Sequence, residues 1–222
     1  MFTERVFERL KPAFEGARDP ERAAGQQAYM RDQFPYLGLT LPVVRKLSRS
    51  VLAGLPPPGD DELREVALRC WAMPEREYQY FACELLRSVP PAPTFLGTLR
   101  QLITTKSWWD TVDPLATRVT GDLVRRNPSL AETMDSWAAD ENLWLVRTAI
   151  LHQLHWGTET DTRRLFSYCT SQAAHQDFFI RKAIGWALRH YARTDPSAVR
   201  AYVDAHRSVL SSLSVREATK HL

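Results

Sequence analysis

The sequence predicts an all-α protein, and three observations support that fold class. Apolar residues recur at intervals of three and four along almost the whole chain, as they do in amphipathic helices. Only 9 of the 222 residues are glycine, and no segment keeps the apolar–polar alternation of a strand. Most of the 14 prolines, such as those of the turn at 56–59, fall where one helical pattern stops and the next begins.

Length and composition indicate a globular domain. Hydrophobic residues make up 44% of the chain and charged residues 25%, so we expect one domain over 1–222 with about six helical pairs. The odd number of cysteines, Cys70, Cys83 and Cys169, favours a reducing compartment. We expect a cytoplasmic monomer with no membrane span, because no run of about 18 apolar residues occurs.

The formal net charge of +3 is unevenly distributed. Residues 1–140 carry 18 Lys or Arg and 19 Asp or Glu, whereas residues 141–222 carry 11 against 7 and all six histidines. A local basic surface can attract a polyanion even when the whole chain is nearly neutral. Solvated helix faces would explain the same excess, so the charge alone does not identify a partner.

Three segments in the second part of the chain repeat one pattern. Residues 107–116, 142–151 and 177–186 align so that Trp109, Trp144 and Phe179 coincide at 35-residue steps. The period is that of a two-helix unit, because a second helical pattern follows each segment. The signature of a tetratricopeptide array is absent, and we predict a HEAT-like helical repeat solenoid whose concave face binds a partner.

In the helix predicted over 107–123, an acid lies one turn after an aromatic residue. Trp109 and Asp113 lie beside the apolar stripe, where ring and carboxylate together suit a developing positive charge. The alternative is an acid that only favours the N-terminal end of the helix dipole. Pro114 predicts a local kink at this point. The apolar stripe itself comprises Trp108, Val112, Leu115, Ala116, Val119 and Leu123.

In the helix predicted over 176–193, cations surround an indole on the face opposite the apolar stripe. This pattern suits phosphates met by cations and a sugar or base packed on the ring, although cation–π packing would also give it. Arg147 lies at the edge of the apolar stripe of the helix predicted over 142–154. Because the three helices repeat in register, we expect Trp109 and Asp113, then Arg147, and then this face to line neighbouring parts of one surface. The four residues of the face are Lys182, Trp186, Arg189 and Arg193.

The chain resembles the AlkD-like DNA alkylation-repair glycosylases over nearly its whole length. The matching strings, in order, are AYMRDQFPYLGLTLPVVRKL, PEREYQYFACELL, TKSWWDTVD, ADENLWLVRTAILHQL, FFIRKAIGWALRHYARTDP and LSVREATKHL. The resemblance implies a C-shaped HEAT-like solenoid that holds duplex DNA in its concave face and excises positively charged N3- or N7-alkylated purines. It also implies contacts with the sugar and backbone in place of a base-flipping pocket.

The resemblance assigns roles residue by residue. Asp113 is the catalytic acid, and Trp109 and Trp186 are the indoles that flank the deoxyribose of the lesion. Arg147 holds a backbone phosphate, and Tyr29 lies against the DNA at the margin of the site. The remaining phosphate contacts are Arg45, Lys182, Arg189 and Arg193.

Two positions depart from the family pattern, and three other functions stay open. Leu41 has no hydroxyl for a DNA contact, and Pro114 directly follows the acid. A self-resistance glycosylase for bulky natural-product adducts and a non-catalytic HEAT-like scaffold are alternatives to the general repair enzyme. A lyase is the third, with Lys106 or Lys182 as the nucleophile.

Metal and cofactor sites are not indicated. His152 and His155 could form a metal-binding pair, but no cysteine or carboxylate completes a ligand set. Glycine-rich phosphate loops and nucleophile elbows do not occur in the sequence. We therefore expect no metal and no nucleotide cofactor.

Overall fold

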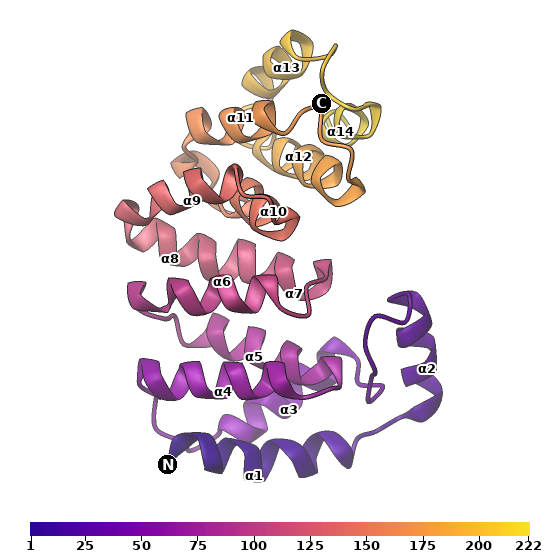
Figure 1. Cartoon of the computed structure of the whole chain (residues 1–222), viewed down its shortest axis with the longest axis vertical. Helices are drawn as coiled ribbons and strands as arrows, with labels where there is room; N and C mark the ends of the chain where they lie inside the picture. Colours follow the sequence, from indigo (N-terminus) through magenta and orange to yellow (C-terminus); the bar gives the residue numbers. More distant parts are fainter. The chain divides into compact units, whose positions relative to one another are not determined.

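The computed structural model describes residues 1–222, and all its regular elements are helices (Figure 1). The predicted all-α class is therefore confirmed. No helix combines the length and the apolar character that a membrane span requires. In chain order the elements are α1 (Phe2–Glu15), α2 (Pro20–Tyr29), α3 (Leu41–Leu52), α4 (Asp60–Ala72), α5 (Arg76–Ser88), η1 (Pro93–Phe95), α6 (Leu96–Thr104), α7 (Trp109–Pro114), η2 (Leu115–Thr120), α8 (Gly121–Arg126), η3 (Pro128–Leu130), α9 (Ala131–Ala138), α10 (Leu143–Leu151), η4 (Gly157–Glu159), α11 (Thr162–Ser171), α12 (Phe178–Tyr191), α13 (Pro196–Ala205) and α14 (Ser212–Ala218).

The elements group into two compact units, Met1–Thr98 and Leu99–Leu222. In the first unit, α1 packs against α3 and α4, and α5 packs against the same two helices. Aromatic residues such as Phe14 and Phe81 fill its core. Helix α2 has no buried residue and is held through Arg22, whose side chain donates to the carbonyl of Gly38.

In the second unit, four helices form a row. Helix α7 with its continuation η2 packs on α10, α10 packs on α12, and α12 packs on α14. Helices α9 and α11 pack on α10, and α13 packs on α12 and α14. This alternation agrees with a two-helix period. The solenoid, its C shape and the single domain over 1–222 stay predictions.

Helix starts set the register of this row. The side chains of Asn142 and Asp177 cap α10 and α12 by accepting backbone N–H groups at 3.0 and 2.6 Å. Trp108 is the N-cap residue of α7 and makes no side-chain cap. Counted from these starts, Asp113 and Arg147 are both the fifth residue of their helix. The two positions are therefore equivalent in neighbouring repeats.

The observed register differs by one residue from the expected one. Trp108, rather than Trp109, packs against Trp144 and Phe179, with ring centroids 6.0 and 5.1 Å apart. Trp109 is the first residue of its helix, whereas Trp144 and Phe179 are the second residues of theirs. The alignment of the three aromatics was therefore one residue out of phase with the helix starts.

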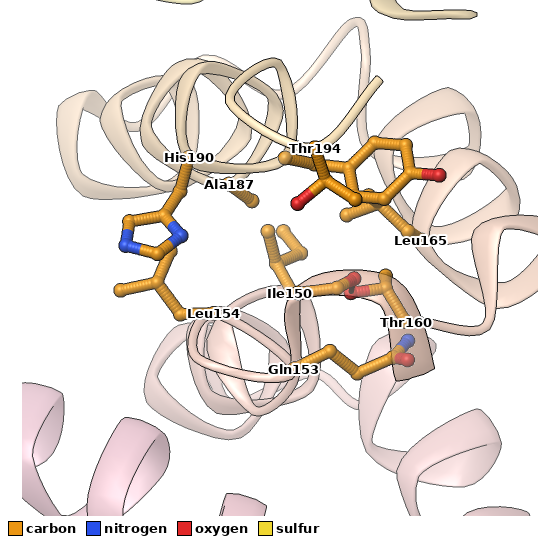
Figure 2. Close-up of a pocket in the computed structure, with 10 residues that line it drawn as sticks. Ile150, Gln153, Leu154, Thr160, Leu165, Ala187, His190 and Thr194 are labelled. Carbon is orange, nitrogen blue, oxygen red and sulfur yellow. Dashed lines mark hydrogen bonds between the residues drawn. The ribbon is translucent and has the colours of Figure 1, made fainter.

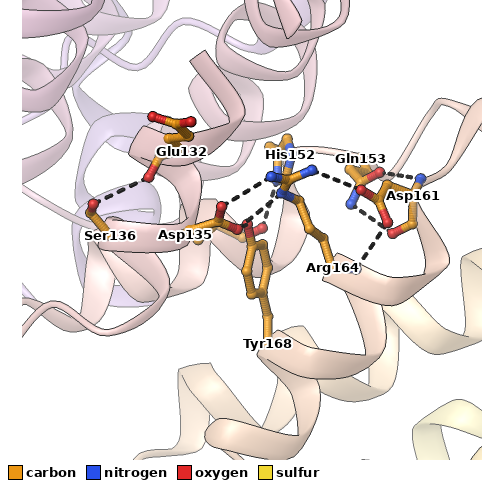
Figure 3. A network of polar contacts seen from close by, with 9 residues as sticks. Glu132, Asp135, Ser136, His152, Gln153, Asp161, Arg164 and Tyr168 are labelled. Atoms are coloured by element: carbon orange, nitrogen blue, oxygen red, sulfur yellow. Dashed lines mark hydrogen bonds and ion pairs between the residues drawn. The ribbon is translucent and has the colours of Figure 1, made fainter. Parts of the chain in front are cut away.

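A polar network joins α9 to α11 (Figure 3). Arg164 lies 3.0 Å from Asp135 of α9 and 2.8 Å from Asp161, the N-cap of α11. The hydroxyl of Tyr168 also donates to Asp135. His152 is buried beside this network, and burial lowers its pKa to about 4. The Arg164 guanidinium therefore connects α9 to the start of α11.

Candidate functional site

An ion pair between Asp113 on α7 and Arg147 on α10 forms the centre of the candidate site. Nε of Arg147 lies 2.7 Å from Oδ1 of Asp113, and Nη2 lies 2.8 Å from Oδ2, which is a bidentate geometry. Only 6% of the Arg147 side chain and 16% of the Asp113 side chain are exposed. The carboxylate is thus fixed in orientation and accessible over a small part of its surface.

The charge state of Asp113 reflects two opposing effects. Burial raises the pKa of its carboxyl group, and the Arg147 guanidinium opposes that rise. The negative charge of Asp110 adds to the rise. Arg147 therefore favours the ionised form of an acid that its surroundings would otherwise push towards the neutral form.

The backbone around Asp113 departs from a regular α-helix. Pro114 has no N–H to donate to the carbonyl one turn earlier, and the helix passes directly into the π turn η2. The hydroxyl of Thr117 donates to the Asp113 carbonyl at 2.8 Å. The kink predicted at Pro114 is therefore a π turn within a helix that continues to Arg126.

A glycine allows the close approach of the two helices that carry the ion pair. A Cβ atom at Gly121 would lie 2.1 Å from the backbone oxygen of His152, just after the end of α10. No residue with a side chain fits there without a shift of the backbone. The position of Gly121 thus helps to bring Asp113 within reach of Arg147.

The remaining side of the Arg147 guanidinium is occupied too. Nη1 donates to the carbonyl of Phe179 on α12 at 2.5 Å, and Cζ lies 6.0 Å from the Phe179 ring centroid. Arg147 is buried, with 5% of the residue exposed. In this structure it orients the acid and connects α10 to both neighbours in the row, whereas its contact with a phosphate stays a prediction.

The two predicted indoles lie outside the buried core. Trp109 and Trp186 are both half-buried. Trp109 precedes Asp113 by four residues on α7, and this spacing places both on one face of the helix. Trp186 follows Lys182 by the same spacing on α12. Each indole therefore keeps accessible area close to a charged group of its own helix.

Lys182 and Arg189 share one acidic partner, Glu217 of α14. The two cations lie 3.0 and 2.7 Å from its carboxylate oxygens. A Cβ atom at Gly185 would lie 2.4 Å from Cβ of Glu217, so α12 and α14 are in close contact. Sequence reasoning missed Glu217, although it follows Lys182 by one 35-residue period. Arg193, in contrast, is exposed and makes no ion pair.

Tyr29 and Arg45 belong to the first unit, not to the unit that carries Asp113 and Arg147. Tyr29 is the last residue of α2 and is 74% exposed. Arg45 on α3 pairs with Glu84 of α5 at 2.9 Å. Leu41, the first residue of α3, is 47% exposed. The contacts of Tyr29 and Arg45 with DNA stay predictions.

The arrangement of side chains in the second unit suits one kind of chemistry. A fixed, partly exposed carboxylate stabilises a positive charge that develops close to it. An indole one turn away offers an electron-rich face to the same charge. Cations on α12 suit a polyanion that would carry the reacting group.

Comparison with known proteins identifies the family. The family model described as DNA alkylation repair enzyme matches residues 10–222. The chain is similar to a solved structure described as a predicted DNA alkylation repair enzyme from Enterococcus faecalis, with 30% identity, a TM-score of 0.84 and coverage of 92% of this chain and 96% of that one. The fold is also similar to that of smu.31 from Streptococcus mutans UA159, with 14% identity, a TM-score of 0.63 and coverage of 82% and 98%. The search of curated proteins found no match. The chain therefore belongs to the DNA alkylation repair enzyme family.

Proposed function

We propose that the protein is a monofunctional DNA glycosylase that hydrolyses the N-glycosidic bond of positively charged N3- or N7-alkylated purines in duplex DNA. The observation that carries the proposal is the partly exposed Asp113 carboxylate, which Arg147 orients one turn away from Trp109. Family membership supports alkylated DNA as the substrate. The proposal includes action as a cytoplasmic monomer, through contacts with sugar and backbone and without a base-flipping pocket.

The chemistry of the substrate explains why so few groups suffice. Alkylation at N3 or N7 makes the purine positively charged, so it leaves as a neutral base when its bond to C1′ breaks. The deoxyribose then gains oxocarbenium character, which the Asp113 carboxylate stabilises by charge. The same carboxylate accepts a hydrogen bond from the water that attacks C1′. Trp109 and Trp186 offer their ring faces to the cationic sugar.

The surroundings of Lys182 favour hydrolysis over a lyase reaction. A lysine nucleophile needs a lowered pKa so that its amine is neutral. Nζ of Lys182 instead lies 3.0 Å from a carboxylate oxygen of Glu217, in an ion pair that would have to break before the amine could attack a sugar. We therefore expect that borohydride traps no covalent adduct between the protein and DNA.

Single-turnover release of 7-methylguanine and 3-methyladenine from duplex DNA tests the proposal. Asp113→Asn should slow release by on the order of 100-fold, as expected when one preorganised stabilising group is lost. Asp122→Asn on α8 is the matched control, because this half-buried acid pairs with Arg126 one turn along its own helix.

Two results would contradict the proposal. Equal release by wild type and Asp113→Asn would remove this acid from the mechanism. Binding of DNA without release of any base, bulky adducts included, would instead favour a non-catalytic scaffold. Release of bulky adducts alone would narrow the substrate to that class.

A further inference from the structure

A buried carboxylate in the first unit binds three consecutive backbone N–H groups. Glu77 on α5 is 0% exposed. Its Oε1 accepts from the backbone N–H groups of Leu37, Gly38 and Leu39 at 3.0, 2.8 and 3.0 Å. Its Oε2 accepts from the N–H group of Leu37 at 2.9 Å. Burial raises the pKa of Glu77, and the three N–H groups oppose that rise. The carboxylate thus holds the segment 37–39 by its backbone.

The segment 37–39 also contacts Asp19, the N-cap residue of α2. The backbone N–H of Asp19 donates to the carbonyl of Leu37 at 2.8 Å. Gly38 has a φ angle of +94°, and a Cβ atom there would lie 2.1 Å from the backbone oxygen of Asp19. Glycine is therefore required at this position, both for its backbone conformation and for the close approach. The segment lies between α5 and the start of α2 and contacts both.

Helix α2 is attached to this segment by polar contacts. It has no buried residue, and no other helix packs extensively against it. The side chain of Arg22 donates to the carbonyl of Gly38 at 3.1 Å, and the amide of Gln26 donates to the carbonyl of Leu39 at 3.0 Å. A helix of 10 residues is only marginally stable in water without tertiary contacts. The position of α2 therefore depends on the segment that Glu77 holds.

Helices of the second unit are held together differently. Figure 2 shows the apolar side chains of Ile150, Leu165 and Ala187, from α10, α11 and α12, around one pocket. All three residues are at most 4% exposed. Apolar packing of this kind spreads the stabilisation over many weak contacts, so it does not depend on any single polar group. The attachment of α2, in contrast, depends on a few hydrogen bonds.

We propose that Glu77 is a positioning residue for DNA binding, because it fixes the segment 37–39 and thereby the helix that presents Tyr29 to the DNA. Tyr29 is the last residue of α2 and is 74% exposed. Its ring reaches the DNA only while α2 keeps its place. Glu77 is buried and acts through α2, without a contact of its own with DNA. The inference rests on the proposed function, because it takes duplex DNA as the partner of Tyr29.

Two substitutions loosen the attachment from opposite sides. Glu77→Gln keeps the size of the side chain, but its NH₂ group replaces an accepting oxygen and brings a donor against backbone N–H groups. Gln26→Ala removes the bond from α2 to the Leu39 carbonyl without any change in charge. Because Gln26 is only half-buried, the core stays intact in this variant, which carries the test even if Glu77→Gln does not fold.

Hydrogen exchange of the full chain, followed by mass spectrometry, measures the attachment directly. In Glu77→Gln and Gln26→Ala, backbone amides within 19–39 should exchange about tenfold faster than in wild type, as expected when a hydrogen bond is lost from a local attachment. The amides of α4 should change less. Glu65→Gln is the matched control, because Glu65 on α4 also joins two elements of this unit, by accepting from the hydroxyl of Thr3 at 2.9 Å.

Equilibrium binding to duplex DNA that contains a stable abasic-site analogue tests the functional link. Tyr29→Ala should weaken binding by about tenfold, within the range for one aromatic contact with nucleic acid. Glu77→Gln and Gln26→Ala should each weaken binding several-fold, and neither should add more than about twofold in the Tyr29→Ala background. Loss of a negative charge would by itself tighten binding to a polyanion, so weaker binding by Glu77→Gln reports position and not charge. Glu65→Gln should bind no more weakly than wild type.

Failure of this inference can be told apart from failure of the proposed function. Unchanged affinity in both Glu77→Gln and Gln26→Ala, or losses that add fully to that of Tyr29→Ala, would overturn the inference. Equal acceleration of exchange in 19–39 and in α4 would also overturn it, because the effect would then be a general loss of stability. If wild type releases no base but the binding losses still depend on Tyr29, the proposed function fails and the role of Glu77 stands.

Discussion

Replacing Arg147 by glutamine should destabilise the protein more than the loss of one surface cation would. The change leaves the Asp113 carboxylate 16% exposed and without its bidentate partner. Removal of one member of a buried ion pair costs about 3–5 kcal/mol. Because Asp113 keeps some contact with water, we expect the lower end, about 3 kcal/mol. For a chain of this size that corresponds to a fall of about 6–12 °C in Tm.

A double-mutant cycle separates the pair from other effects of the substitutions. Asp113→Asn leaves the Arg147 guanidinium buried, with the Phe179 carbonyl as its remaining acceptor. The double variant Asp113→Asn/Arg147→Gln replaces both charges with neutral amides that can bond to each other. Its loss of stability should therefore be smaller than the sum of the single losses, by about 2–3 kcal/mol.

Urea unfolding followed by circular dichroism measures all four free energies of the cycle. Urea is uncharged and does not screen the ion pair, unlike guanidinium chloride. Single losses that add to within about 0.5 kcal/mol in the double variant would refute the reasoning, since independent sites behave in that way. Arg126→Gln, which removes a surface cation that pairs with Asp122, is the control for a general loss of charge.

Three further predictions concern the same row of helices. The rate of base release should fall as pH is lowered, because only the ionised form of Asp113 stabilises the sugar cation. The midpoint of this fall should lie above the pKa of an ordinary aspartate, because burial raises the pKa of Asp113. Arg147→Gln should move that midpoint to higher pH, and a pH–rate profile with an unmoved midpoint would contradict this. Glu217→Gln frees the two cations on α12, so it should tighten DNA binding by up to about eightfold per phosphate gained, as measured by titration against salt. Gly185→Ala should cost about 1–3 kcal/mol in urea unfolding, since its Cβ would lie 2.4 Å from that of Glu217, and an unchanged midpoint would show that α12 and α14 can separate freely.

The buried faces of the helices could be predicted from sequence, because burial follows the period of the helix. Val112, Leu115 and Val119 on one helix, and Ile180 and Ile184 on another, are all at most 2% exposed, as their spacing indicates. The helix around Pro114 was predicted too, but not its π turn. A proline can kink a helix, or the helix can continue past it through a local π turn. The packing of neighbouring helices decides between the two, and the period of the apolar residues does not describe that packing.

The ion pairs of the site were beyond sequence reasoning for a different reason. A helical wheel shows that Lys182 and Arg189 share a face, but not which carboxylate from another helix reaches them. The pairing of Asp113 with Arg147 depends on where each helix starts, and α7 has no capping side chain to mark its start. Once the helix starts are known, the repeat shows the relation, because Asp113 and Arg147 are each the fifth residue of their helix.

Along the row of helices, two cations lie between two acids at steps of 34, 35 and 35 residues, in the order Asp113, Arg147, Lys182 and Glu217. Arg147 and Lys182 are thus each paired with an acid of their own chain before the protein meets DNA. At Arg147 and Lys182, a phosphate must therefore displace a carboxylate before the cation can bind it. We expect this exchange to keep encounters with undamaged DNA short, because phosphate contacts dominate non-specific binding. Shorter contacts with undamaged DNA would reduce the time that a repair enzyme needs to find a lesion.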